Sequence, residues 1–137
     1  MGLPIVADYM ATDLVTLTAE MEINKAMTEL LDKRVSGAPV VDDQGRVVGM
    51  LSKKDCLRAA FSASYHREWG GTVAEYMTKD VQTLHPDATL LQAVETFLAG
   101  PYRRFPVLRD GQLVGQISRA DVLQALVDQW VPEHPRS

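Results

Sequence analysis

The sequence predicts a mixed α/β (α+β) fold built from two similar β-α-β-β-α repeats that pack with pseudo-two-fold symmetry. Three observations support this prediction. Short segments of the first half recur, in order, in the second half. Apolar residues follow strand spacing and helical spacing in the same order in both halves. One half alone is small for a self-sufficient hydrophobic core, so we expect the two halves to pack sheet against sheet.

The internal duplication keeps its register through both halves of the chain. Matched residues lie 67 positions apart in the first part of each half, as Met10 and Met77 do, and 66 positions apart in the rest. The one missing residue falls in a turn, where a deletion is best tolerated. We therefore place repeat 1 at residues 1–66 and repeat 2 at residues 67–137.

Each repeat contains the same predicted elements. A short helical turn is followed by a brief β run, an amphipathic helix, two strands joined by a tight turn, and a final helix that follows Ser-x-x-Asp. Repeat 1 places these elements before Met10, at 14–17, around Ile23, Ala26, Met27, Leu30 and Leu31, at 38–41 and 46–51, and after Asp55. Repeat 2 places them before Met77, at 81–84, around Leu90, Ala93, Val94, Phe97 and Leu98, at 105–108 and 112–117, and after Asp121.

Proline, glycine and serine residues indicate what lies between these elements. Pro86-Asp87 is a start signal for the amphipathic helix of repeat 2. Serine and glycine residues predict a linker over 62–71, and the tail 131–137 is expected to be loose. An aromatic and basic cluster lies in the linker, where it either packs the linker down or forms an interaction patch. Its members are Tyr65, His66, Arg67 and Trp69.

The composition argues against several classes of protein. A formal net charge of −4 without a basic stripe argues against a nucleic-acid-binding face. The single cysteine, Cys56, excludes an internal disulfide, and its match to Val122 predicts a core position. No apolar run approaches the roughly 18 residues of a membrane span, and the start lacks a secretory signal. We therefore expect a cytoplasmic protein that uses no membrane, and the scattered histidines predict no metal site.

The stretch Ser-x-x-Asp occurs twice, from Ser52 to Asp55 and from Ser118 to Asp121, each time between a strand and a helix. The first N–H groups of a helix have no partner within the helix, so such a start suits an anion. The same residues also form a variant of the capping box, which needs no ligand. Both interpretations stay open, and they are compatible if the serine caps the helix while the aspartate faces a ligand.

The complete pattern resembles a known family. Met10, Val35–Asp42 and Gly49–Asp55 have counterparts in register in the second half. This set closely resembles a tandem pair of CBS (cystathionine-β-synthase) domains, a Bateman module, over nearly the entire chain. The resemblance implies that AMP, ADP, ATP or S-adenosylmethionine binds as a regulatory ligand, and not as a catalytic cofactor, in clefts between the repeats. It also implies a disc-like homodimer formed through helices and an unidentified, regulated protein partner.

The resemblance also implies roles for individual residues. The aspartates would bind ribose hydroxyls, the serines would lie near a phosphate, and short apolar segments would contact the base. Leu14 is one of the candidates for contact with the base. The other implied ligand-binding residues are Val15, Val35, Ser36, Gly37, Ala38, Ser52, Lys53, Asp55, Val81, Tyr102, Arg103, Arg104, Phe105, Ser118, Arg119 and Asp121.

Charge predicts that the two sites differ. Three arginines lie near Asp121 in the sequence pattern, whereas Asp55 has only two lysines nearby and Gly37 stands at the position of Arg104. We therefore predict tighter binding at Asp121. Adjacent strand residues point to opposite faces, so at most one of Arg103 and Arg104 is expected to reach a phosphate directly.

Two rival functions are weighed against a nucleotide sensor. An enzyme is not expected, because the sequence has no Ser/His/Asp constellation, no P-loop and no spaced metal ligands. A ligand-independent dimerisation or scaffold module shares every core feature of the sensor. Asp121→Ala separates the two, because this change should abolish nucleotide binding by a sensor and leave a scaffold almost unaffected.

Overall fold

A computed structural model describes residues 4–66 and 70–130, which belong to two compact units. One unit is Val15–Val81, here named the Asp55 unit. The other joins residues up to Leu14 with those from Gln82 onward and is named the Asp121 unit. The predicted fold class is confirmed, because each unit combines helices with one small sheet.

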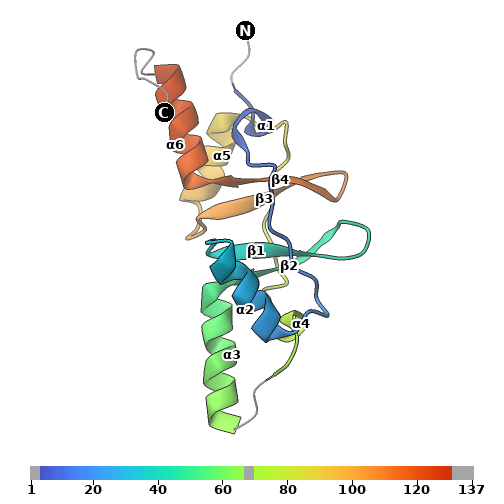
Figure 1. Cartoon of the computed structure of the whole chain (residues 1–137). Coiled ribbons are helices and arrows are strands. Elements are labelled where there is room, and N and C mark those ends of the chain that lie inside the picture. The colour runs from blue at the N-terminus through green and yellow to red at the C-terminus, as the bar shows by residue number, and fades with distance from the viewer. Residues whose placement is uncertain (1–3, 67–69, 131–137) are drawn as a thin grey trace. The chain divides into compact units, whose positions relative to one another are not determined.

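The Asp55 unit is an antiparallel hairpin with helices on one face (Figure 1). Ile23, Ala26 and Leu30 recur at helical spacing and are all buried, which explains why this segment forms an amphipathic helix. These side chains pack with strand residues such as Val40 and Leu51 in one hydrophobic cluster. The elements are α2 (Ile23–Asp32), β1 (Gly37–Val41), β2 (Val47–Ser52), α3 (Lys53–His66) and α4 (Val73–Tyr76).

The Asp121 unit repeats this arrangement with its own hydrophobic cluster. Leu90, Ala93 and Phe97 form the buried face of its amphipathic helix, and the ring of Phe97 lies 4.6 Å from that of Phe105. The elements are α1 (Val6–Tyr9), α5 (Leu90–Leu98), β3 (Arg104–Arg109), β4 (Gln112–Ser118) and α6 (Arg119–Trp130). The predicted helical turns, amphipathic helices and hairpins are thus confirmed in both units.

The two repeats exchange their short N-terminal helices. Helix α1 of repeat 1 belongs to the Asp121 unit, where Ala11 and Gln116 exchange two backbone hydrogen bonds of 2.8 and 2.9 Å. Helix α4 of repeat 2 belongs to the Asp55 unit, where Met50 and Thr78 do the same. The compact units therefore cut the chain differently from the sequence repeats. The boundary between 1–66 and 67–137 stays a prediction about the duplication.

Glycines in the second strand of each hairpin allow this exchange. A Cβ at Gly49 would lie 2.6 Å from the Sδ of Met77, and a Cβ at Gly115 would collide with the Sδ of Met10. Each methionine thus packs directly over a strand that has no side chain at that point. The duplicated methionines serve the packing of each unit.

Two predicted segments are shorter than expected. The β runs at 14–17 and 81–84 reduce to single parallel bridges, from Leu17 to Val40 and from Leu84 to Val107. The strand that each bridge joins contains a proline, which has no N–H to extend the ladder.

The linker prediction was wrong for residues 62–66, which continue helix α3 to His66. No glycine or proline lies between Lys53 and His66, so nothing in the sequence interrupts the helix over these residues. Arg67 and Trp69 of the aromatic and basic cluster, the side chain of His66, and the tail 131–137 lie outside the described residues.

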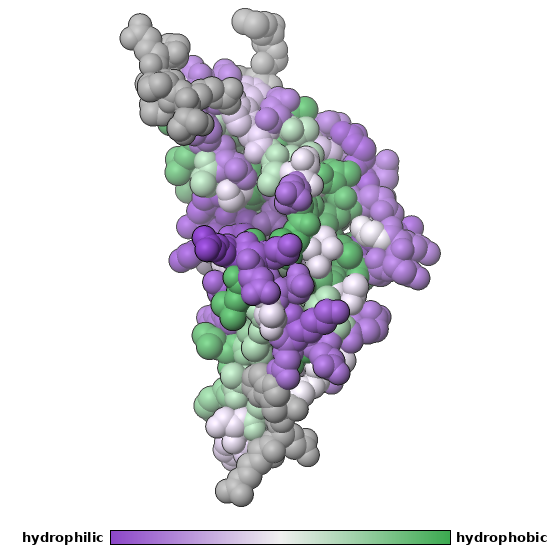
Figure 2. Space-filling model, in the orientation of Figure 1, coloured by the Kyte–Doolittle hydropathy of each residue, from purple (hydrophilic) through white to green (hydrophobic). Residues whose placement is uncertain are grey.

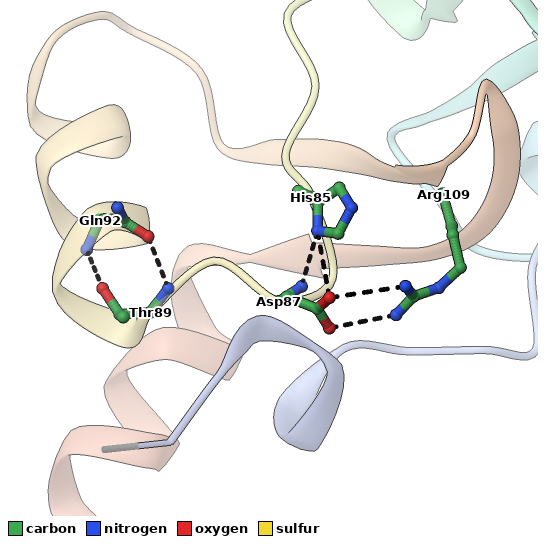
Figure 3. A network of polar contacts seen from close by, with 5 residues as sticks. All are labelled: His85, Asp87, Thr89, Gln92 and Arg109. Atoms are coloured by element: carbon green, nitrogen blue, oxygen red, sulfur yellow. Dashed lines mark hydrogen bonds and ion pairs between the residues drawn. The ribbon is translucent and has the colours of Figure 1, made fainter. Parts of the chain in front are cut away.

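The start signal at Pro86-Asp87 was also placed too early, because the N-cap of α5 is Thr89. Thr89 and Gln92 form a reciprocal capping box with bonds of 2.8 and 3.1 Å (Figure 3). Asp87 instead belongs to a turn, where its N–H donates to His85 Nδ1 and its carboxylate pairs with Arg109 (Figure 3).

Among the described residues, no helix combines the length and the apolar character that crossing a membrane requires.

Candidate functional site

Each Ser-x-x-Asp stretch lies where a strand runs directly into a helix. Strand β2 ends at Ser52 and α3 begins at the next residue, and strand β4 ends at Ser118 where α6 begins. The backbone therefore turns without an intervening loop, and the serine becomes the last residue before the helix. Position and chemistry are the same in both units.

The serine and the aspartate cap each other in both units. The N–H of Asp55 donates to Ser52 Oγ at 3.1 Å, and Asp55 Oδ2 accepts from the N–H of Ser52 at 2.9 Å. The same two bonds join Ser118 and Asp121, with the same lengths. The capping interpretation is therefore correct, and it includes the aspartate: each carboxylate turns one oxygen back toward its serine.

The segment before the proline lies against the helix start. Gly37 faces Ser52 across the β1–β2 ladder, and Arg104 faces Ser118 across β3–β4. Facing residues project to the same side of a sheet, so the Arg104 side chain shares a face with Ser118. The structure thus brings Arg104, rather than Arg103, to the side of Ser118.

Backbone bonds occupy most of each helix start. The N–H of Lys53 donates to the carbonyl of Ser36 at 2.9 Å, and the N–H of Arg119 donates to that of Arg103 at 3.0 Å. Because the aspartate N–H is capped as well, one free N–H per helix start is left in the described chain, at Lys54 and at Ala120. An anion would therefore meet one free amide, not the open set expected from the sequence.

The carboxylate of Asp55 is buried and has partners on both oxygens. Oδ2 accepts from the N–H and from the hydroxyl of Ser52, each at 2.9 Å. Oδ1 accepts from Arg58 Nη1 at 2.7 Å. The side chain of Asp55 is 5% exposed and that of Arg58 is 61% exposed. A buried carboxylate is thus neutralised by an exposed arginine of its own helix.

The carboxylate of Asp121 is half-buried and has one oxygen free. Its Oδ2 accepts from Ser118, and within the described residues its Oδ1 has no hydrogen-bond partner. Gln124 stands at the position of Arg58 and donates to Asp128 at 2.8 Å. Arg119 donates through Nε to the carbonyl of Tyr102 at 2.9 Å, so it is tied to the same segment.

Several predicted site residues belong to the hydrophobic clusters instead of an open surface. Ala38 and Phe105 are fully buried, and the ring of Phe105 also lies 5.5 Å from that of Tyr102. Val15 and Val35 are partly buried against the cluster of the Asp55 unit. Ala38 and Phe105 therefore present almost no surface to a ligand, whereas Tyr102 is exposed.

Arg58 is the residue that the sequence analysis missed. The signal was present, because Asp55 and Arg58 are three residues apart on a predicted helix and neighbours at that spacing interact. The second repeat has Gln124 at this position, so the duplication also marked the difference. In the described part of the chain, no three His, Cys, Asp or Glu side chains converge to hold a metal ion.

Comparison with known proteins identifies the family. The model of the CBS domain family matches residues 6–62 and 73–128. The chain belongs to the CBS domain family. Its two copies correspond to the two repeats of the sequence, so the predicted tandem CBS pair is confirmed.

Solved structures agree with this assignment. The structure of CBSX2 from Arabidopsis thaliana in complex with AMP is 28% identical to this CBS pair. It matches with a TM-score of 0.82 and covers 93% of this chain and 98% of that chain. The fold of this CBS pair is thus shared with a protein that binds an adenine nucleotide.

Curated relatives extend beyond the CBS pair. An uncharacterized protein of Methanocaldococcus jannaschii is 30% identical over 129 residues, which are 94% of this chain and 45% of that protein. The 5'-AMP-activated protein kinase subunit gamma-3 of Sus scrofa is 31% identical over 121 residues, which are 84% of this chain and 24% of that protein. The chain thus spans less than half the length of these relatives.

Proposed function

We propose that this CBS pair is a regulatory module that binds an adenosine-containing nucleotide, with AMP as the first candidate, and binds it more tightly in the Asp121 unit than in the Asp55 unit. The observation that carries this proposal is the free Oδ1 of Asp121 at a helix start that shares a sheet face with Arg104. The similarity to CBSX2 in complex with AMP supports the choice of ligand.

The chemistry of the Asp121 unit fits a nucleoside monophosphate. A carboxylate oxygen accepts a ribose hydroxyl in a charge-assisted hydrogen bond. The Arg104 guanidinium, the Ser118 hydroxyl and the free N–H of Ala120 form a donor set suited to a phosphate. Arg103 and Arg119 add positive charge nearby. One oxygen for the sugar and several donors for the phosphate would orient the ligand along the helix start.

The remaining predicted residues would bind the base or support the site. We infer that Tyr102 of the Asp121 unit offers apolar surface to an adenine ring, whose flat face suits such contacts, and that Val15 and Val81 offer it in the Asp55 unit. Ser36, Gly37 and Ser52, with Lys53, would form the weaker counterpart at Asp55. ADP, ATP and S-adenosylmethionine share the adenosine group and are the next ligands to test.

We infer that this module acts through a partner protein and not by catalysis. A ligand can shift an equilibrium only by its differential affinity for two states, so the module needs two geometries or two partner affinities. The match to a subunit of a protein kinase supports a place in a larger assembly. Location in the cytoplasm stays a prediction. Incubation with AMP or ATP followed by chromatography should return the nucleotide unchanged.

We also infer a homodimer formed through the final helices of the repeats. Leu57 and Phe61 lie one turn apart on α3 and are 70% and 75% exposed. Leu123 and Trp130 lie two turns apart on α6 and are 62% and 71% exposed. Figure 2 shows hydrophobic surface along α3. In sedimentation experiments, Phe61→Glu and Leu123→Glu should convert dimer to monomer.

The exposed apolar helix residues also favour the second candidate, a ligand-independent assembly module. Such a module would dimerise through the same surfaces and would bind no nucleotide. The exposed residues of α3 and α6 are compatible with both functions, whereas the free carboxylate oxygen of Asp121 is useful only to the sensor. Ligand binding therefore decides between them.

The deciding experiment is calorimetric titration of the whole chain with AMP. Asp121→Ala should weaken the tighter site about 30-fold, because a hydrogen bond to a charged group contributes about 2 kcal/mol. Asp55→Ala should leave the tighter site unchanged. Thr89→Ala is the matched control, since it removes a helix cap of the same unit that is not part of the site.

The outcomes separate the two candidate functions. A weakening of the tighter site by about 30-fold in Asp121→Ala, with unchanged affinity in Thr89→Ala, supports the sensor. Two equivalent sites would refute the predicted inequality. No heat from AMP, adenosine or S-adenosylmethionine with a folded dimer would overturn the sensor and favour the assembly module.

A further inference from the structure

We propose that Arg58 is a built-in competitor for the Asp55 carboxylate, and that a ligand must displace it before Asp55 can accept a ribose hydroxyl. This inference rests on the proposed nucleotide binding and deepens it. It assigns the difference between the two sites to one side chain on helix α3. It also makes that difference a property that substitution can transfer from one unit to the other.

The contacts of Asp55 leave little room for a further donor. Its two oxygens accept three hydrogen bonds, two from Ser52 at 2.9 Å and one from Arg58 at 2.7 Å. A carboxylate has about four lone-pair positions, and here the group is buried to 5% exposure. The bond from Arg58 is the shortest of the three and the only one made by another helix residue. It occupies the oxygen that is free in Asp121.

The equivalent residue of the other unit leaves its aspartate alone. Gln124 aligns with Arg58 in the duplication, and its amide donates to Asp128 one turn further along α6. A neutral amide does not compete for a carboxylate as a guanidinium does, because it has neither the charge nor the fork of donors. The free Oδ1 of Asp121 follows from this replacement.

Displacement of Arg58 is feasible because its side chain is 61% exposed. Its guanidinium can return to water. The ion pair with Asp55 therefore raises the dissociation constant for the ligand but does not block the site. Exposed ion pairs on a helix contribute modest free energies, and the lower effective dielectric around a buried partner strengthens the attraction between the charges. From these ranges we expect Arg58 to weaken binding at Asp55 about fivefold.

The test isolates one site at a time in the full chain. In an Asp121→Ala background only the Asp55 site remains, and Arg58→Gln should tighten adenosine binding there about fivefold. In an Asp55→Ala background, Gln124→Arg should weaken adenosine binding at Asp121 by the same factor. Adenosine is the probe because it has no phosphate, so direct attraction between Arg58 and a phosphate cannot obscure the competition.

A second variant and a second ligand sharpen the test. Arg58→Ala removes every donor and should tighten adenosine binding as Arg58→Gln does. AMP in the same backgrounds should gain less than adenosine, because the lost cation also attracts its phosphate. Circular dichroism of each variant shows whether the overall helix content is retained.

Each outcome decides one question. Unchanged or weaker adenosine binding in Arg58→Gln and Arg58→Ala, with normal binding at Asp121, overturns the competitor and leaves the proposed function intact. If the Asp55 site stays too weak to titrate, Gln124→Arg decides, and unchanged binding at Asp121 overturns the proposal. Absence of adenosine and AMP binding in every protein, including the unsubstituted chain, is instead the failure of the proposed function.

Discussion

The Asp55 unit and the Asp121 unit build the same helix cap and surround it with different charges. Both caps have the same two reciprocal bonds between serine and aspartate. In the Asp55 unit the nearby cation is on the helix and pairs with the carboxylate. In the Asp121 unit no cation pairs with the carboxylate among the described residues, and Arg104 faces the serine from the neighbouring strand. The cap maintains the fold, and the placement of one arginine decides whether an aspartate is available.

The Asp55 unit cannot simply receive the arginine of the other unit. A Cβ at Gly37 would lie 3.0 Å from the carbonyl oxygen of Leu51 and 3.2 Å from the Cα of Ser52. Both atoms belong to the backbone, so the strand would have to shift. The two differences act together. The Asp121 unit has a free carboxylate oxygen and an arginine on the facing strand, and the Asp55 unit has neither.

The largest expected effect tests whether the two units are built alike. Gly49→Val and Gly115→Val should each destabilise the fold by about 3 kcal/mol, because side chains inserted into packed sites cost this much. At both glycines a Cβ would also lie 3.0 Å from a backbone carbonyl oxygen, of Thr78 or of Ala11. Urea denaturation measures the loss.

The control for these variants is Gly111→Ala in a turn. Gly111 has a φ of +81°, and a Cβ added to it would meet no atom within 4 Å, so only backbone strain of about 1 kcal/mol is expected. A loss at Gly49 or Gly115 no greater than that at Gly111 would contradict the packing of the exchanged methionines.

The next effect tests Arg104, the arginine that faces Ser118 in the Asp121 unit. Arg104→Ala should weaken AMP binding about tenfold, since a charge-assisted contact with phosphate contributes about 1.4 kcal/mol, and should leave adenosine binding unchanged. Titration with both ligands measures this. Arg103→Ala is the matched control, because Arg103 precedes the strand and its side chain is exposed. Equal losses in the two variants would show that charge, and not register, determines binding.

A smaller difference is expected between the two serines. Ser52 Oγ both accepts from the N–H of Asp55 and donates to its carboxylate, whereas Ser118 Oγ only accepts from Asp121. Ser52→Ala should therefore cost about 1.5 kcal/mol and Ser118→Ala about 1 kcal/mol in the free energy of unfolding. Urea denaturation of both variants gives the order. The reverse order would mean that the hydroxyl bond to Asp55 contributes nothing.

The smallest effect concerns Cys56, whose counterpart is Val122. Burial raises the pKa of the Cys56 thiol, and the charge of Asp55 adds to this. A raised pKa in the folded state contributes stability below the pKa of the unfolded thiol, about 8.5, and this contribution is lost as the pH rises further. Between about pH 7.5 and 9.5, the chain should therefore lose slightly more stability than Cys56→Val does. Equal losses would show that the thiol does not titrate in this range.

The duplication made the elements predictable, because each helix and strand appeared twice with the same spacing. The exchange of α1 and α4 was not predictable from local sequence. Gly49 and Gly115 provide equivalent packing positions for Met10 and Met77. Local chemistry therefore does not determine which hairpin each helix packs on. That choice depends on the path of the chain between the units.

The candidate site was predicted in part. Ser-x-x-Asp identified both helix starts and their capping, since these depend on neighbours within one turn. The register that places Arg104 beside Ser118 depends on strand pairing, which alternation alone does not set. The partner of Asp55 depends on the direction that a side chain takes along its own helix. Arg58 turns back to Asp55, whereas Gln124 points forward to Asp128.

The exchanged helices have a consequence for the history of the chain. A single repeat carries the strand with its glycine but would have to turn its own α1 segment back to cover it. In this chain the segment instead covers the strand of the other repeat. An ancestral gene that encoded one repeat with the same geometry would have needed a second copy of its product to complete its fold. Gene duplication would then have converted an obligate pair of identical molecules into one polypeptide, and freed its two halves to diverge at positions such as Arg58 and Gln124.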